Sequence, residues 1–194
     1  MTPLAERLAH RTIELVDIAS ESLHEAEARA YVRARVPASL HPAFLGEDAA
    51  LWLPQRRPGT PLVVLAGHYD TVPAQDNLPG SIEDGWVAGL GAADMKGGVV
   101  VALELLRDLD ERPPQDADVG LLLFGREELP SVFNPLPELF DNAPELREAA
   151  LAILLEPTAG LIHAGCVGNI TARIRFRGVS GHARSEEHTS ELQS

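Results

Sequence analysis

The sequence predicts an α/β domain built on a largely parallel β-sheet that is flanked by helices. Three continuous apolar runs, typical of strands buried on both faces, lie at residues 62–66, 119–124 and 151–155. Between the first two runs, residues 94–109 carry apolar side chains at helical spacing, which predicts a helix with one apolar face. Strands that alternate with helices favour parallel pairing, because a parallel connection needs a crossover.

The segment before the first buried strand is expected to hold two helices and two strands. Apolar residues at helical spacing predict a helix over about residues 3–19. Ser22 and Glu25 have the spacing of a capping box, which predicts a second helix that starts there and stops before Pro37. Residues 43–53 are typical of two short strands joined by a turn.

The remaining chain predicts a hairpin, short helices and a second sheet. Asp84-Gly85 between short apolar runs indicates the hairpin. Residues 130–150 are typical of short helices interrupted by proline, and over residues 162–176 the pattern changes to β alternation. We therefore expect one domain over residues 1–165 and the beginning of another over residues 166–183.

The final residues, 184–194, are excluded from these expectations. Their string, Arg-Ser-Glu-Glu-His-Thr-Ser-Glu-Leu-Gln-Ser, has no apolar periodicity and resembles the translation of a sequencing-library adapter. We therefore interpret them as a non-native tail, with a genuine polar tail as the alternative.

Composition argues against several classes of function. The chain of 194 residues carries 16 Lys and Arg against 29 Asp and Glu, and its net charge of −13 argues against binding to nucleic-acid phosphates. No apolar run approaches the roughly 20 residues of a membrane span, and the charged N-terminus is unlike a signal peptide. Cys166 is the only cysteine, which fits a reducing compartment. We expect a cytoplasmic protein without nucleic-acid or membrane partners.

Polar side chains follow each of the three buried strands, and another acid opens the helix after the hairpin. Functional groups gather beyond the carboxyl ends of strands in α/β sheets, so these side chains are expected at one rim. A histidine with several carboxylates is a ligand set for a borderline metal such as zinc, with one acid left for proton transfer. The residues are His68, Asp70, Asp94, Glu127, Glu128 and Glu156.

Each of these residues alone has an ordinary structural explanation. His68 fits a satisfied core histidine, Asp70 a turn cap, and Asp94 a helix N-cap worth about 1 kcal/mol. The glutamates fit solvated loop or strand-end positions. Three successive strands that all end in acids or histidine are not explained in this way. Because a cluster of carboxylates is costly without a cation, the joint pattern favours a metal site.

The candidate residues lie in four sequence motifs. The motifs are Gly67-His68-Tyr69-Asp70-Thr71-Val72-Pro73, Gly91-Ala92-Ala93-Asp94-Met95-Lys96-Gly97-Gly98, Glu127-Glu128 and Glu156-Pro157-Thr158. In this order they resemble the motifs of the co-catalytic di-zinc family of deacylases and peptidases, and the resemblance covers about residues 3–183. The family includes succinyl-diaminopimelate desuccinylase, acetylornithine deacetylase, aminoacylase and glutamate carboxypeptidase. Asn77-Leu78-Pro79 leans toward the desuccinylase branch.

The resemblance implies two Zn²⁺ ions, with Co²⁺ as a substitute. His68 and Glu156 would bind one ion, Glu128 would bind the second, and Asp94 would bridge both. The peptide bond after Asp94 would be cis. Residues 1–165 would form the N-terminal part of a zinc-aminopeptidase-like catalytic domain.

The resemblance also implies the remaining catalytic roles. Asp70 would orient the imidazole of His68, and Glu127 would be the general base. Gly178-Val179-Ser180-Gly181-His182 resembles the family's lid motif, in which His182 would polarise the substrate carbonyl in the partner's site. Residues 166–183 would then begin an α+β lid domain that forms a homodimer.

The implied function is hydrolysis of an N-acyl amino acid, with N-succinyl-LL-2,6-diaminopimelate of lysine biosynthesis as the first expectation. Acetylornithine deacetylase and carboxypeptidase are alternatives within the family. An inactive truncated fragment is the alternative of another class, because the family's last zinc ligand is a histidine beyond the end of this chain. Two departures, Leu90 for a frequent arginine and Pro130 for a frequent glycine, bear only on the subfamily.

Two rival enzyme classes are disfavoured by the sequence. Gly89-Leu90-Gly91-Ala92-Ala93-Asp94 resembles a dinucleotide fingerprint, but it follows a hairpin and ends in an acid that would repel a pyrophosphate. A serine hydrolase is disfavoured because the sequence holds no Gly-x-Ser-x-Gly.

Overall fold

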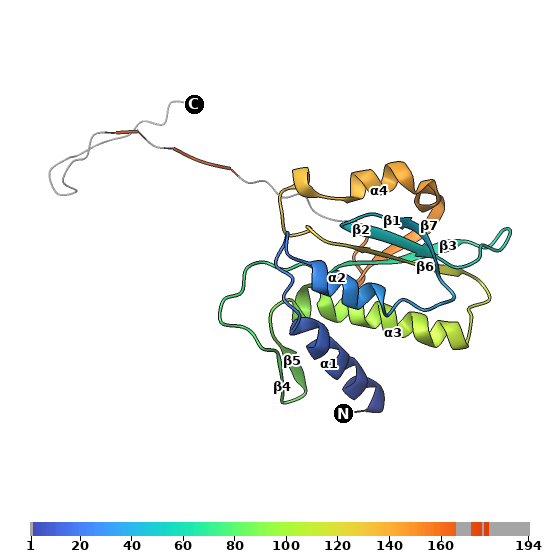
Figure 1. Cartoon of the computed structure of the whole chain (residues 1–194), viewed down its shortest axis with the longest axis horizontal. Helices are drawn as coiled ribbons and strands as arrows, with labels where there is room; N and C mark the ends of the chain where they lie inside the picture. Colours follow the sequence, from blue (N-terminus) through green and yellow to red (C-terminus); the bar gives the residue numbers. More distant parts are fainter. Residues whose placement is uncertain (1, 166–171, 176, 179–194) are drawn as a thin grey trace. The chain divides into compact units, whose positions relative to one another are not determined.

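The computed structural model describes residues 2–165, 172–175, 177 and 178 (Figure 1). The chain divides into two units, Met1–Gly160 and Leu161–Ser194, and the helices and strands below belong to the first. The predicted domain ranges stay predictions. Of residues 162–176, where β alternation was predicted, those that the structure describes lie outside any strand.

The first unit is built on a five-stranded sheet with the strand order β1-β2-β6-β3-β7. β3 pairs in parallel with β6 and β7, whereas β2 is antiparallel to both β1 and β6. The predicted α/β class and the parallel pairing of the three predicted strands are thus confirmed. The predicted burial holds for β3 and β6. It is wrong for β7, which lies at the edge of the sheet and exposes Leu151, Ile153 and Leu154. The strands are β1 (His41–Leu45), β2 (Ala49–Leu53), β3 (Leu62–His68), β6 (Asp118–Phe124) and β7 (Ala149–Leu154).

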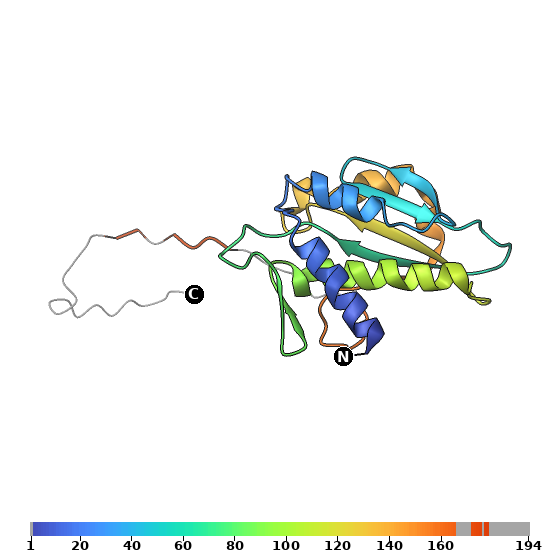
Figure 2. The same ribbon diagram turned by 60° about the horizontal axis from the view of Figure 1, so that its bottom comes forward.

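Helices cover both faces of the sheet. On one face lie α1 (Pro3–Val16), α2 (Ala26–Arg33) and α3 (Gly97–Glu111), and on the other lies α4 (Leu136–Asn142) (Figure 1). In Figure 2 the blue α1 crosses the green α3, which it contacts. Short 3₁₀ turns at Ser131–Phe133 and Pro144–Glu148 flank α4, as the proline pattern predicts. Within the described residues, every helix is too short or too polar to cross a membrane.

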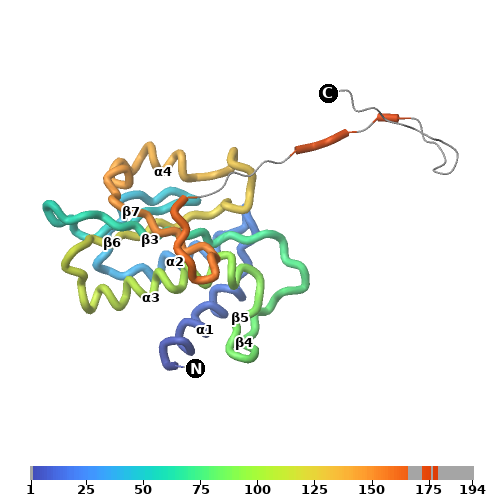
Figure 3. The backbone as a smooth tube through the Cα atoms, turned by 180° about the vertical axis from the view of Figure 1, so that it is seen from behind, coloured from blue at the N-terminus to red at the C-terminus, as the bar shows by residue number. Residues whose placement is uncertain are grey.

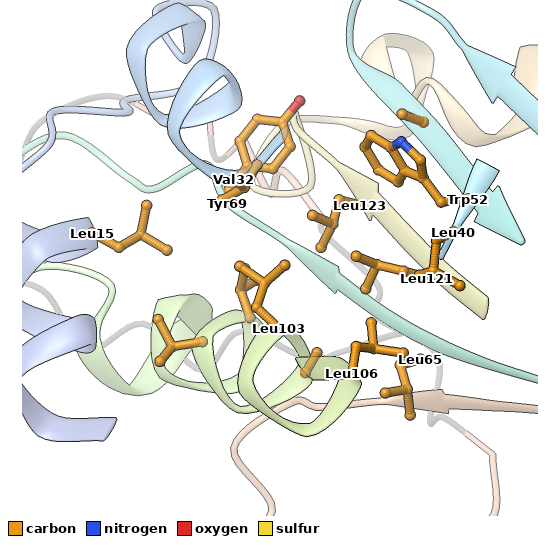
Figure 4. Close-up of a cluster of buried hydrophobic side chains, with 14 of the residues drawn as sticks. Leu15, Val32, Leu40, Trp52, Leu65, Tyr69, Leu103, Leu106, Leu121 and Leu123 are labelled. Atoms are coloured by element: carbon orange, nitrogen blue, oxygen red, sulfur yellow. The ribbon is translucent and has the colours of Figure 1, made fainter. Parts of the chain in front are cut away.

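Alternation along the buried strands fills a separate core on each face. Leu121 and Leu123 of β6 pack with Leu103 and Leu106 of α3 on one face (Figure 4), whereas Leu122 belongs to the core beside α4. The side chains of a strand point alternately to opposite faces, so continuous apolar runs are needed where both faces are buried. The apolar runs of β3 and β6 are therefore explained by the two cores.

The predicted hairpin is confirmed. β4 (Ser81–Glu83) and β5 (Trp86–Ala88) form a two-stranded sheet that contacts α1 (Figure 3). Asp84 and Gly85 at the turn have positive φ angles of 50° and 85°. Such angles match the strand twist in a two-residue hairpin turn, which explains the Asp-Gly sequence.

Of the predicted helices, the first starts at Pro3 as expected and ends at Val16, whereas the starts of the next two are wrong. α2 begins at Ala26 without a side-chain cap, because Ser22 lies outside the helix and its hydroxyl bonds to a distant carboxylate. α3 begins at Gly97 rather than at Asp94, whose backbone angles of −119° and 98° are not helical. Ser22 and Asp94 instead contact Asp70 and His68 at the rim of the sheet.

Gly98 allows α3 to pack closely against the end of β7, and its replacement gives a test of the fold. A Cβ atom at this position would lie 2.3 Å from the carbonyl oxygen of Leu155. Gly98→Ala should therefore lower the free energy of unfolding by about 1–3 kcal/mol, the usual cost of overpacking. Urea unfolding measures the change. Val101→Ala, at an exposed position on the same helix, should change it by about 0.5 kcal/mol or less. Equal effects of the two substitutions would contradict this packing.

Candidate metal centre

The carboxyl ends of β3, β6 and β7 meet at one rim of the sheet and carry most of the predicted site. His68 is the last residue of β3 and pairs in register with Phe124, the last residue of β6. Glu127 and Glu128 follow in the loop after β6, and Glu156 lies two residues beyond β7. The shared end of three parallel strands thus brings together residues that lie far apart in the sequence.

The imidazole of His68 lies at the centre of these residues and is fully buried. Its Nε2 atom lies 3.1 Å from Oδ1 of Asp94, 3.9 Å from Oε1 of Glu156 and 4.0 Å from Oε2 of Glu127. One ligand atom each from His68, Asp94 and Glu128 lie within 4.8 Å of one another. The structure therefore brings the four predicted metal ligands His68, Asp94, Glu128 and Glu156 close together at the rim.

Asp70 lies behind His68, fully buried, and four donors lie around its carboxylate. Nδ1 of His68 lies 3.2 Å from Oδ1 of Asp70 and also hydrogen-bonds to the backbone carbonyl of Asp70 at 3.2 Å. The Oδ1 atom accepts from the backbone N–H of Glu127 at 3.1 Å. Its Oδ2 atom accepts from the hydroxyl of Ser22 at 2.6 Å and from the backbone N–H of Glu128 at 3.2 Å. When Nδ1 of His68 donates to Asp70, Nε2 is the nitrogen that can bind a metal.

The loop that carries Glu127 and Glu128 is also held from its other side. Arg126 adopts a left-handed φ of 61° and its guanidinium pairs with Asp48 at 2.9 Å. The backbone carbonyl of Asp48 accepts from the N–H of Gly125 at 2.8 Å. Gly125 and Arg126, which precede the two glutamates, are thus both bound to Asp48. These contacts fix the turn after β6 from which the glutamates extend.

Asp94 reaches the rim from an irregular turn, Ala92–Lys96, that precedes α3. The N–H of Lys96 closes this turn on the carbonyl of Gly91 at 2.8 Å. The ammonium of Lys96 is buried, donates to the carbonyl of Ile18 at 2.8 Å, and has its pKa lowered by burial to about 8. The Asp94–Met95 peptide bond is cis, as the resemblance implies.

The cluster carries more negative charge than the protein itself balances. Burial disfavours the charged form of His68, but the hydrogen bond and charge of Asp70, with the charges of Glu156 and Glu127, raise its pKa to about 9. Burial and the charge of Asp94 raise the pKa of Glu128. Burial also raises the pKa of Glu156, with Asp94 and Glu127 acting in the same direction and His68 opposing them. These shifts show that the rim favours additional positive charge.

The donor set fits a divalent metal. An imidazole nitrogen and several carboxylate oxygens are the ligands that zinc takes in catalytic sites. Asp70 differs from the other carboxylates, because burial raises its pKa but its four hydrogen bonds, led by those of His68 and Ser22, lower it below its usual range. Asp70 therefore remains an ionised acceptor that orients a ligand, and the residues at the rim would hold the metal.

The predicted site and the site in the structure differ at two residues, His182 and Ser22. His182 lies outside the described residues. Ser22 was missed, because its spacing to Glu25 predicts a local cap rather than a bond to Asp70.

An α/β sheet that carries a buried histidine among carboxylates at its carboxyl rim is an arrangement typical of metal-dependent hydrolases. The chain belongs to the family described as Peptidase family M20/M25/M40, whose model matches residues 64–183. The resemblance seen in the four motifs is thereby confirmed.

Two relatives of the chain are named for the same activity. The chain is 42% identical over 121 residues to succinyl-diaminopimelate desuccinylase of Corynebacterium glutamicum. This match covers 62% of this chain and 33% of the relative. It is 38% identical over 174 residues to a proposed succinyl-diaminopimelate desuccinylase, DapE, of Mycobacterium tuberculosis. This match covers 89% of this chain and 48% of the relative. The chain therefore spans about a third to a half of the length of these relatives.

A solved structure shares the fold. The YXEP protein of Bacillus subtilis, described as a dinuclear metal binding peptidase from the M20 family, matches with a TM-score of 0.55 at 15% identity. The match covers 79% of this chain and 43% of that one.

Zinc binding at this rim should stabilise the protein measurably. At free zinc of about 100 times the dissociation constant, linkage predicts about 2.7 kcal/mol of added stability. Asp94→Asn should lose most of the zinc-dependent rise in the thermal unfolding midpoint, because an amide oxygen is a weaker ligand than a carboxylate. Asp116→Asn is the matched control, since Asp116 is exposed and lies at the opposite end of β6. An unchanged zinc response in Asp94→Asn would show that Asp94 does not bind the metal.

Proposed function

We propose that the complete protein containing this chain is a zinc-dependent amidohydrolase that cleaves an N-acyl amino acid. The proposed substrate is N-succinyl-LL-2,6-diaminopimelate, which gives succinate and diaminopimelate. The observation that carries the proposal is the convergence of His68, Asp94, Glu128 and Glu156 at the rim. The names of the relatives at 38–42% identity support the substrate.

The proposal assigns the four ligands to two zinc ions. His68 and Glu156 would hold one ion, Glu128 the other, and Asp94 both, with Co²⁺ as a substitute. When bound, such ions lower the pKa of a water molecule toward about 7 and polarise the amide carbonyl. The protein contributes the orientation of the ligands, since Asp70 fixes the ring of His68 and the backbone of the Glu127–Glu128 loop.

Glu127 would perform the proton transfers of the reaction. Its side chain is 44% exposed and its Oε2 atom lies 4.0 Å from Nε2 of His68, so it borders the ligands and is open to solvent. As general base, it would take a proton from the attacking water as the carbon–oxygen bond forms. It would then return that proton to the departing amine as the amide carbon–nitrogen bond breaks.

The proposal also includes a homodimer. His182 of one protomer would donate a hydrogen bond to the substrate carbonyl in the partner's site, where negative charge develops during attack. Residues 166–183 would belong to the lid domain that forms this dimer.

Glu127 and Glu128 should separate by role although they are neighbours. In the complete protein, Glu127→Ala should retain both zinc ions and lose about 10²–10⁴-fold in turnover, because only the proton transfer is removed. Glu128→Ala should lose one zinc ion, and activity should fall as a consequence. Elemental analysis beside turnover measures both effects, with the exposed Glu145→Ala as control. If Glu127→Ala loses zinc and Glu128→Ala does not, the two roles are reversed.

Substrate preference decides the branch of the family. The complete protein should hydrolyse N-succinyl-LL-2,6-diaminopimelate with a higher kcat/KM than N-acetylornithine or simple N-acyl amino acids. The loss of all activity with a chelator, and its return with Zn²⁺ or Co²⁺, should accompany this preference. A preference for N-acetylornithine would overturn the substrate, and the absence of metal-dependent amide hydrolysis would overturn the proposed function.

A further inference from the structure

Ser22, in the loop between α1 and α2, forms the shortest hydrogen bond to Asp70. Its hydroxyl donates to Oδ2 of Asp70 at 2.6 Å, whereas the other three donors lie at 3.1–3.2 Å. Ser22 is 9% exposed and Asp70 is fully buried. A hydrogen bond to an ionised group is strong where water is excluded, so this contact restrains the carboxylate firmly.

The backbone fixes Ser22 independently of its hydroxyl. The N–H of Ser22 donates to the carbonyl of Thr71 at 3.1 Å, and the N–H of Thr71 donates to the carbonyl of Ser20 at 2.9 Å. Glu21 and Thr71 thereby form a parallel bridge. Because Thr71 directly follows Asp70, the loop is held in register with the residue that its hydroxyl contacts.

Ser22 differs in origin from the other donors to Asp70. His68, Glu127 and Glu128 are themselves predicted ligands or catalytic groups, and Asp70 is what aligns them. Ser22 comes from a segment that supplies none of the predicted ligands. Without its hydroxyl, Oδ2 of Asp70 would keep one donor, the N–H of Glu128 at 3.2 Å, and the carboxylate could rotate about its Cβ–Cγ bond.

We propose that Ser22 is a positioning residue that fixes the plane of the Asp70 carboxylate and, through it, both His68 and the Glu127–Glu128 loop. The inference rests on the proposed function, since it assigns Ser22 to the same centre. Loss of an outer partner of a metal ligand typically costs about 10–100-fold in metal affinity or activity. Ser22 acts one step further out, so we expect an effect of about tenfold in each.

The test compares two serines of one loop in the complete protein. Ser22→Ala removes the donor to Asp70. Ser20→Ala is the matched control, because Ser20 is also buried but its hydroxyl forms no hydrogen bond within the described residues. Ser22→Thr restores a hydroxyl. Zinc affinity is measured by competition with a chromophoric chelator, together with kcat, KM and the thermal unfolding midpoint.

Ser22→Ala should weaken zinc binding and lower kcat by about tenfold each with little change in KM, because alignment rather than substrate binding is affected. Ser20→Ala should resemble the wild type, and Ser22→Thr should recover both properties. If Ser22→Ala lowers only the unfolding midpoint, the serine has a structural role and the inference is wrong. It is equally wrong if Ser20→Ala has the same effects, or if Ser22→Thr is as defective as Ser22→Ala.

If Ser22→Ala does not fold, Ser22→Cys takes its place, because a thiol fills the same space but is a weak donor. The same losses are expected, and wild-type zinc affinity and kcat in Ser22→Cys would overturn the inference. A wild-type protein that neither binds zinc nor hydrolyses amides would overturn the proposed function. A functional wild type with unaffected Ser22 variants would overturn this inference alone.

Discussion

Asp70 lies fully buried beneath the rim of the sheet and accepts hydrogen bonds from three separate segments of the chain. A carboxylate has about four acceptor positions, and four donors surround this one: the imidazole of His68, the hydroxyl of Ser22 and the backbone N–H groups of Glu127 and Glu128. The tautomer of the histidine and the path of the catalytic loop therefore depend on one group. Fold and chemistry are joined here, because the end of β3 and the loop after β6 are aligned by the same two oxygen atoms.

The second constraint is charge. Asp70 is satisfied by its hydrogen bonds, but burial and the neighbouring carboxylates Asp94 and Glu127 raise the pKa values of Glu128 and Glu156 in front of His68. The fold nevertheless holds these carboxylates near one another, because Asp94 lies on a non-helical turn and Glu156 lies two residues beyond β7. A divalent cation removes the cost of such a cluster, so the site that is least favourable for the protein alone is the one best suited to bind metal.

The strands and the rim could be predicted from the sequence because they depend on local patterns. An apolar run followed by acids marks both a strand and its functional end, and parallel topology then places His68, Glu128 and Glu156 together. The exposure of β7 could not be predicted in this way, because it depends on the position of the strand at the edge of the sheet. The starts of the second and third helices could not be predicted either. The spacing of Ser22 and Glu25 fits a cap, but a hydroxyl also bonds to any carboxylate that tertiary structure brings near, and Asp70 is 48 residues away. The ion pair of Arg126 with Asp48 could not be predicted for the same reason, because Asp48 lies in the turn between β1 and β2, far from Arg126 in the sequence.

Diffraction at the zinc absorption edge from crystals of the zinc-loaded complete protein tests the organisation of this centre most directly. The account predicts two anomalous peaks at the rim, with Nε2 of His68 and carboxylate oxygens of Asp94, Glu128 and Glu156 about 2.0–2.2 Å from zinc. Asp70 should remain bonded to His68 and Ser22, and Glu127 should contact no metal. Zinc bound by Glu127 or Asp70, or a histidine that turns away from both peaks, would contradict it.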